Sequence, residues 1–185
     1  MKKTIFLLTI LCAAALWACN DDEPKFSTAE IREALSDLKG TYRGEVKVSY
    51  YQGAAIATIP DATAVSDDSL TFTLPLAPLA DQIEDEIISE YLRKTGKITV
   101  KAGYEFLQMD NGTLHFVLHP RDILFPGGYG ASPGITFVFS QIYGGSAEPH
   151  HRAMMFNMSV IQILANAKKY EDFKPLVYHF EGKDE

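Results

Sequence analysis

Apolar and polar residues alternate along several short stretches of the chain, which is the pattern of half-buried β-strands. In residues 41–51, Tyr42, Val46 and Val48 fall on one face, and charged side chains fill the other. Turn signals such as Asp110-Asn111-Gly112 separate the stretches. The predicted strands are residues 41–51, 54–59, 69–74, 97–110, 113–119, 135–143, 152–164 and 176–181.

Two segments change to a helical period. Ser27 and Glu30 have the spacing of a capping box, which predicts a helix over residues 28–38 that ends before Gly40. Apolar residues four apart predict a second, amphipathic helix over residues 79–92. The first helix is expected to pack over one end of a sheet.

The remaining segments are predicted as connections. Pro60 and Asp61 are expected to end the second strand, and residues 126–134 form a glycine-rich loop. Residues 144–150 are predicted to be a turn, and residues 165–172 a short helical turn.

About eight short strands with turn signals predict a mainly β fold with a minor helical part, either an antiparallel barrel or a sandwich. Residues 38–44, Leu-Lys-Gly-Thr-Tyr-Arg-Gly, resemble the first strand of calycin-like (lipocalin-related) barrels, and residues 178–182 suit a closing strand. This resemblance implies a calycin-like barrel. The helix at 79–92 departs from a plain up-and-down barrel, so the sandwich also stays open.

The N-terminus has the three-part form of a secretory signal, with a basic start, an apolar run and a short cleavage region. Leu16, Ala18 and Cys19 resemble the lipobox of bacterial lipoproteins. The resemblance implies that residues 1–18 are a lipoprotein signal peptide and that Cys19 carries the lipid, which holds the protein to a membrane. An ordinary secreted protein cut near Ala18 is the alternative.

Residues 19–26 are predicted to be a lipidated tether, and residues 27–185 a single β-rich domain. The acidic run directly after Cys19 resembles the export signal of Bacteroidetes-type surface lipoproteins. That resemblance implies an outer-membrane lipoprotein of the cell envelope, exposed at the surface. A plain solvated linker is the alternative.

Composition changes this picture in two ways. The full chain has 185 residues and a formal charge of −7, and removal of residues 1–18 leaves 167 residues with 15 basic and 24 acidic groups. The acidic balance argues against a nucleic-acid partner. Because Cys12 leaves with the signal and Cys19 takes the lipid, no thiol is left for a disulfide or a cysteine-bound metal, and no cofactor is expected.

Aromatic residues on or beside the strands are the candidate ligand-binding residues. They either pack the core or line an incompletely filled barrel that holds a small apolar or glycan ligand. The candidates are Tyr104, Phe106, Phe116, Tyr129, Phe137 and Phe139.

The polar motifs predict no catalytic or metal site. His115 and His119 have the spacing of a helical zinc pair, but they fall on a predicted strand, where four residues span roughly 13 Å. A cluster of His119, Asp122, His150 and His151 across loops is the alternative metal hypothesis. The chain has no Gly-x-Ser-x-Gly elbow and no phosphate-binding loop.

The sequence therefore predicts a lipid-anchored envelope protein that binds a small apolar or glycan ligand and is not an enzyme. The alternative is a structural or accessory subunit with an envelope protein partner, and a hydrolase with an unrecognised site is a third hypothesis.

Overall fold

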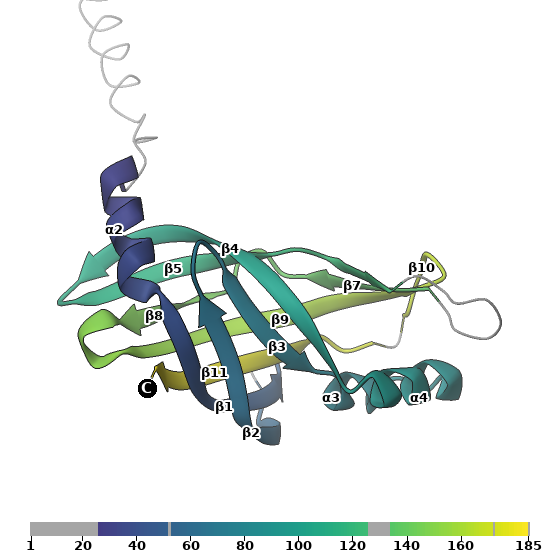
Figure 1. Ribbon diagram of the computed structural model, residues 1–185. Coiled ribbons are helices and arrows are strands. Elements are labelled where there is room, and N and C mark those ends of the chain that lie inside the picture. The colour runs from purple at the N-terminus through teal and green to yellow at the C-terminus, as the bar shows by residue number, and fades with distance from the viewer. Residues whose placement is uncertain (1–25, 52, 126–133, 172, 185) are drawn as a thin grey trace, which may run out of the picture.

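A computed structural model describes residues 26–51, 53–125, 134–171 and 173–184 of the chain (Figure 1). The predicted signal peptide, Cys19 and nearly all of the tether lie outside the described residues. The glycine-rich loop also lies outside them, apart from Gly134.

The described residues form eleven strands in one sheet, with three α-helices and one 3₁₀ turn. The strands are β1 (Gly40–Tyr50), β2 (Ala55–Ser66), β3 (Leu70–Pro75), β4 (Lys97–Asp110), β5 (Thr113–Pro120), β6 (Ile123–Phe125), β7 (Ile135–Phe139), β8 (Gly144–Glu148), β9 (Ala153–Ala165), β10 (Lys168–Lys169) and β11 (Leu176–Asp184). The helices are α2 (Thr28–Leu38), α3 (Ala77–Ala80), α4 (Glu86–Thr95) and the 3₁₀ turn η1 (Pro149–His151).

Eight of these strands close into an antiparallel barrel, which confirms the predicted fold class and decides for the barrel over the sandwich. β1 to β5 pair in sequence order, β5 pairs with β8, and β8 pairs with β9. The ring closes because β11 pairs with both β9 and β1. β7 pairs with the C-terminal part of β9, as Figure 1 shows, and β6 pairs with the other edge of β7.

The barrel interior is filled by side chains, as expected for a ring of eight strands. Phe72, Phe156 and Phe180 meet at its centre, with ring centroids 5.0–5.8 Å apart. All three are at most 1% exposed, and each buried ring of this size contributes about 2 kcal/mol from apolar burial.

α2 lies at one end of the barrel (Figure 1), as the sequence predicts. Its capping box is present: the Ser27 hydroxyl accepts from the Glu30 backbone N–H, and the Glu30 carboxylate accepts from the Ser27 backbone N–H at 2.7 Å. Ala34 and Leu38 are the buried residues of this helix. The Tyr42 hydroxyl donates to the Leu38 carbonyl at 2.9 Å. These contacts fix the helix to the start of β1.

The predicted single helix over residues 79–92 is wrong, because the segment forms two helices, α3 and α4, at the opposite end of the barrel (Figure 1). Pro78 stands in the first turn of α3, where a proline is favoured. Asp85 starts α4 by accepting a hydrogen bond from the Ile88 N–H at 3.1 Å. The break turns Ile87 to solvent, 62% exposed, although the helical pattern predicts it on the buried face.

Three predicted connections also differ from the structure. β2 continues through Pro60 and Asp61, where a register shift absorbs the extra residue and Asp61 takes a positive φ of 57°. The predicted turn at 144–150 contains β8, which pairs with β5 and β9. The predicted helical turn at 165–172 is a tight hairpin into β10, with Asn166 and Ala167 at positive φ.

Candidate binding groove on the outer wall

The predicted ligand-binding aromatics lie in the core of the barrel. Tyr104 stacks on Phe106 at 5.5 Å and meets Phe116 edge-on at 5.2 Å, near the α2 end. Phe137 and Phe139 are buried on β7, at 0% and 2% exposure. Tyr129 lies outside the described residues. Contact of the six residues with a ligand stays a prediction, and the five that the structure describes pack in or against the hydrophobic core.

The cavities of interest lie instead on the outer wall, on the outward-facing rows of β1, β11, β9 and β8. The strand register places these outward residues side by side. One row runs from Glu45 through Glu181 and Met155 to Ser146. The next row contains Lys47, His179 and Asn157, followed by Ser49, Val177 and Ser159.

One cavity, which we call the aromatic groove, has a volume of about 700 Å³. It lies where the turn after β1, the start of β11, the middle of β9 and the link between β7 and β8 meet. Its lining residues are Tyr50, Tyr51, Ser140, Ile142, Tyr143, Ser159, Ile161, Lys174 and Pro175.

Apolar side chains of the aromatic groove are unusually open to solvent. Ile142 is 82% exposed, Tyr51 64% and Ile161 43%. Burial raises the pKa of the Tyr143 phenol above its ordinary value, and the Tyr51 phenol adds to the shift, which places the two rings in the same neighbourhood. An aromatic and aliphatic cluster left in water is typical of a surface that binds something.

Two buried serines supply hydroxyls to the aromatic groove. Ser140 and Ser159 are 8% and 1% exposed, and the Ser140 backbone N–H donates to the Ser159 carbonyl at 3.0 Å. This bond joins the link after β7 to β9 and fixes both serines at the lining. A serine hydroxyl both donates and accepts, so it can bond to a ligand hydroxyl in either direction.

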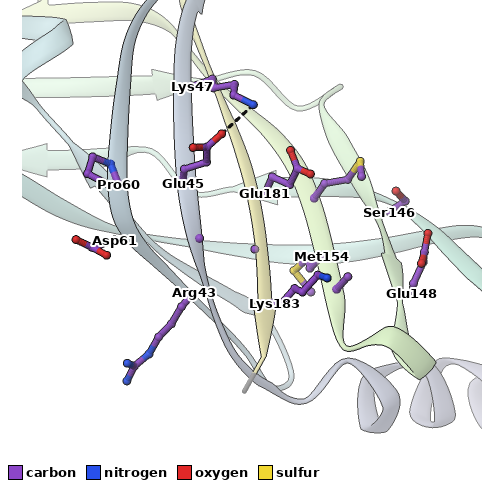
Figure 2. A pocket seen from close by; sticks show the side chains of 14 residues that line it. Arg43, Glu45, Lys47, Pro60, Asp61, Ser146, Glu148, Met154, Glu181 and Lys183 are labelled. Carbon is purple, nitrogen blue, oxygen red and sulfur yellow. Dashed lines mark ion pairs between the residues drawn. The ribbon is translucent and has the colours of Figure 1, made fainter.

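A second cavity, which we call the charged groove, lies on the same wall nearer to the α2 end and has a volume of about 740 Å³. Figure 2 shows Glu45 and Lys47 on one strand, joined by an ion pair of 2.8 Å, and Glu181 and Lys183 on the neighbouring strand. Its lining residues are Arg43, Gly44, Glu45, Lys47, Pro60, Asp61, Ser146, Glu148, Ala153, Met154, Met155, Glu181, Gly182 and Lys183.

Glycines let β1 and β11 approach closely beneath the charged groove. A Cβ added at Gly44 would collide with the backbone of Glu181 and Gly182 on β11. A Cβ at Gly182 would meet the ring of Phe180 and the carbonyl of Arg43. Close approach of a neighbouring backbone is a common reason for glycine inside a strand, and here it holds the strands that carry Glu45 and Glu181 side by side.

The largest pKa shifts belong to core tyrosines rather than to either groove. Burial raises the pKa of Tyr42 to about 12, and it raises the pKa values of Tyr104 and Tyr178 further above the ordinary range. Each hydroxyl has a partner: Tyr104 bonds Ser66 at 2.7 Å, and Tyr178 donates to the Pro75 carbonyl at 3.1 Å. These shifts therefore reflect packing of the barrel.

The histidines do not gather into a site. His115 and His119 lie on strand β5 as predicted, and His119 bonds Glu105 across to β4 at 2.8 Å. Asp122 instead accepts a hydrogen bond from the Phe139 backbone N–H at 3.1 Å. Across the described residues, no three His, Cys, Asp or Glu side chains are placed to hold one metal ion.

Comparison of the chain with protein-family models, with curated proteins and with solved structures finds no match. The functional argument therefore depends on the chain's own residues.

The sequence did not predict either groove, because the lining residues come from five separate strands, β1, β2, β8, β9 and β11, and from the connections beside them. The available signal was weak: Tyr50-Tyr51 ends the predicted strand 41–51, and two adjacent aromatics on a strand cannot both point inward. Ile142-Tyr143 ends the predicted strand 135–143, which in the structure stops at Phe139.

Proposed function

We propose that this protein is a lipid-anchored component of the cell envelope that binds a small apolar or glycan ligand in the aromatic groove of its outer wall. The single observation that carries the proposal is the exposed cluster of Tyr51, Ile142 and Ile161 around a cavity of about 700 Å³. A cavity of this size, with apolar walls and a few fixed polar groups, is typical of small-ligand sites.

Because the interior of the barrel is filled, we place the proposed site on the outside of the barrel. Phe72, Phe156 and Phe180 occupy the centre, which a carrier of the enclosed type would leave open. The aromatic groove needs no opening of the barrel, because it is already on the surface.

The proposed anchor would orient the groove. Phe26 is seven positions after Cys19, and a fully extended chain of that length would reach about 25 Å. The α2 end of the barrel would then face the membrane, and the aromatic groove, beyond the last residues of β1, would lie on the side away from it. Within the described residues, no helix is long and apolar enough to span a bilayer.

The test is calorimetric titration of the full-length protein in lipid nanodiscs with maltose, cellobiose, chitobiose and sodium octanoate. We expect at least one of these probes to bind, and Tyr143→Ala to weaken that binding by at least about tenfold. Ile87→Ala, an exposed apolar residue on α4, is the matched control and should leave the affinity unchanged. Absence of heat with all four probes, or binding indifferent to Tyr143→Ala, contradicts the proposal.

The same exposed side chains favour one alternative, an accessory subunit that docks on an envelope protein through Ile142 and Tyr51. In that case Ile142→Asp should abolish co-purification of a chemically cross-linked protein partner while the four small probes remain inert. Binding of a probe in the groove would instead favour the ligand-binding function.

A further inference from the structure

The aromatic and charged grooves are close neighbours on one wall. Lys47 of the charged groove and Tyr50 of the aromatic groove are three residues apart on β1, about 10 Å along an extended strand. Met155 and Ser159 are four residues apart on β9, about 13 Å.

The side chains between the two grooves are polar and only partly exposed. The row between the grooves contains His179 and Asn157, whose side chains bond to each other at 3.0 Å and are only partly exposed. On β8 the same stretch starts with Gly144, which has no side chain to stand in the way. From Pro175 to Lys183 the wall extends over eight residues of chain, roughly 26 Å.

The aromatic groove and the charged groove offer different chemistry. The aromatic groove has the rings of Tyr51 and Tyr143, against which the apolar C–H face of a sugar ring can pack, and the serine hydroxyls beside them. The charged groove has nearly equal numbers of carboxylates and cations. Such a lining suits a ligand with many hydroxyl groups better than a ligand with one net charge. An acyl chain laid along the wall would leave much of its length against charged groups and water.

We propose that the two grooves together form one extended site for a linear, uncharged oligosaccharide, with one end stacked on Tyr51 and Tyr143 and the chain continuing over Glu181 and Lys183. This inference rests on the proposed function and deepens it, because it names the ligand class and its length.

The experiment compares short and long members of the same series, using full-length protein in nanodiscs. Cellobiose, maltose and chitobiose are titrated beside cellohexaose, maltohexaose and chitohexaose. We expect one hexasaccharide to bind at least about tenfold more tightly than its disaccharide. The double variant Glu181→Ala/Lys183→Ala should remove most of that gain and leave the disaccharide affinity unchanged.

Both substituted residues are exposed, so the variant is expected to fold. Glu90→Ala/Lys94→Ala on α4, also an exposed acid and lysine, is the matched control and should change neither affinity. Equal affinity of the disaccharide and the hexasaccharide, no effect of the double variant, or binding of octanoate alone overturns the inference while the proposed function stands. Absence of binding by every probe, octanoate included, removes the proposed function and the inference with it.

Discussion

A single carboxylate joins three strand ends of the barrel. Asp184 on β11 accepts a hydrogen bond from the Thr41 backbone N–H at 3.2 Å and forms an ion pair with Arg152. Its own backbone N–H donates to the Arg152 carbonyl at 2.8 Å. Its side chain is 10% exposed, so the bonds are largely shielded from water. Asp184 therefore fastens the end of β11 to the start of β1 and to Arg152, the residue before β9.

This carboxylate gives a pH-dependent prediction. The Arg152 guanidinium and the Thr41 N–H lower the pKa of Asp184 below its ordinary value of 3.8. A lowered folded-state pKa contributes stability above the ordinary pKa, and that contribution is lost as the pH falls through the folded-state pKa. We expect Asp184→Asn to cost about 1 kcal/mol at pH 7, and the difference from wild type to shrink as the pH falls below 3.8 and through the lowered folded-state pKa, in urea unfolding.

Asp37→Asn is the control for this prediction. Asp37 is an exposed carboxylate on α2, and its replacement should change the free energy of unfolding little at any pH. A cost for Asp184→Asn that stays constant from pH 7 to pH 2 would show that the loss of charge is not the cause.

At the scale of the element, glycine decides how closely two strands can approach. Gly44 and Gly103 both stand inside strands, but only Gly44 presses against a neighbouring backbone. The space around a Cβ at Gly103 is open to 4 Å. The same substitution should therefore have opposite effects at the two positions.

Gly44→Ala is expected to destabilise the protein by about 2–3 kcal/mol, because the new methyl group must push β1 and β11 apart. Gly103→Ala should be neutral or stabilise by up to about 1 kcal/mol, since it lowers the entropy of the unfolded chain. Thermal and urea unfolding measure both. Equal effects of the two variants would mean that the contact of Gly44 with β11 does not determine the packing.

The strands and helices also show how much of the fold the sequence predicts. Strong local patterns predict β1, β4, β5 and α2 closely, because alternation and a capping box are properties of neighbouring residues. β8 is missed because Gly144 and Gly145 read as a turn, and it becomes a strand only through pairing with β5 and β9. The helix over 79–92 is wrong because period alone does not locate the N-cap at Asp85.

The sequence did not predict the candidate site for the same physical reason, which is that its residues come together only through pairing of distant strands. The sequence left the strand aromatics open as either core or pocket residues, and the structure places Phe116 and Phe137 in the core. Tyr51 and Tyr143 come together only after the ring closes, and no local pattern relates a turn after β1 to the link before β8. The strand number and a short resemblance predicted a mainly β barrel or sandwich, and the structure confirms that fold class and decides for the closed barrel.

At the scale of the whole molecule, the predicted anchor and the barrel are separable. Because Cys19 is the predicted lipid site, Cys19→Ala should move the protein from the membrane fraction to the soluble fraction without changing the melting temperature of the barrel. Fractionation of cells followed by immunodetection measures the first effect, and circular dichroism the second. A variant that stays with membranes as before would show that another feature holds the protein there.

The central claim is that the ligand site lies on the outer wall and not inside the barrel. The most direct measurement is methyl NMR of the full-length protein in nanodiscs, with labelled isoleucine and methionine, during titration with the tightest of the saccharide probes. If the ligand binds on the outer wall, the methyl signals of Ile142 and Ile161 should move with the bound fraction. The signal of Met158, which is 1% exposed in the interior, should stay in place. Movement of Met158 with Ile142 and Ile161 unchanged would contradict the claim.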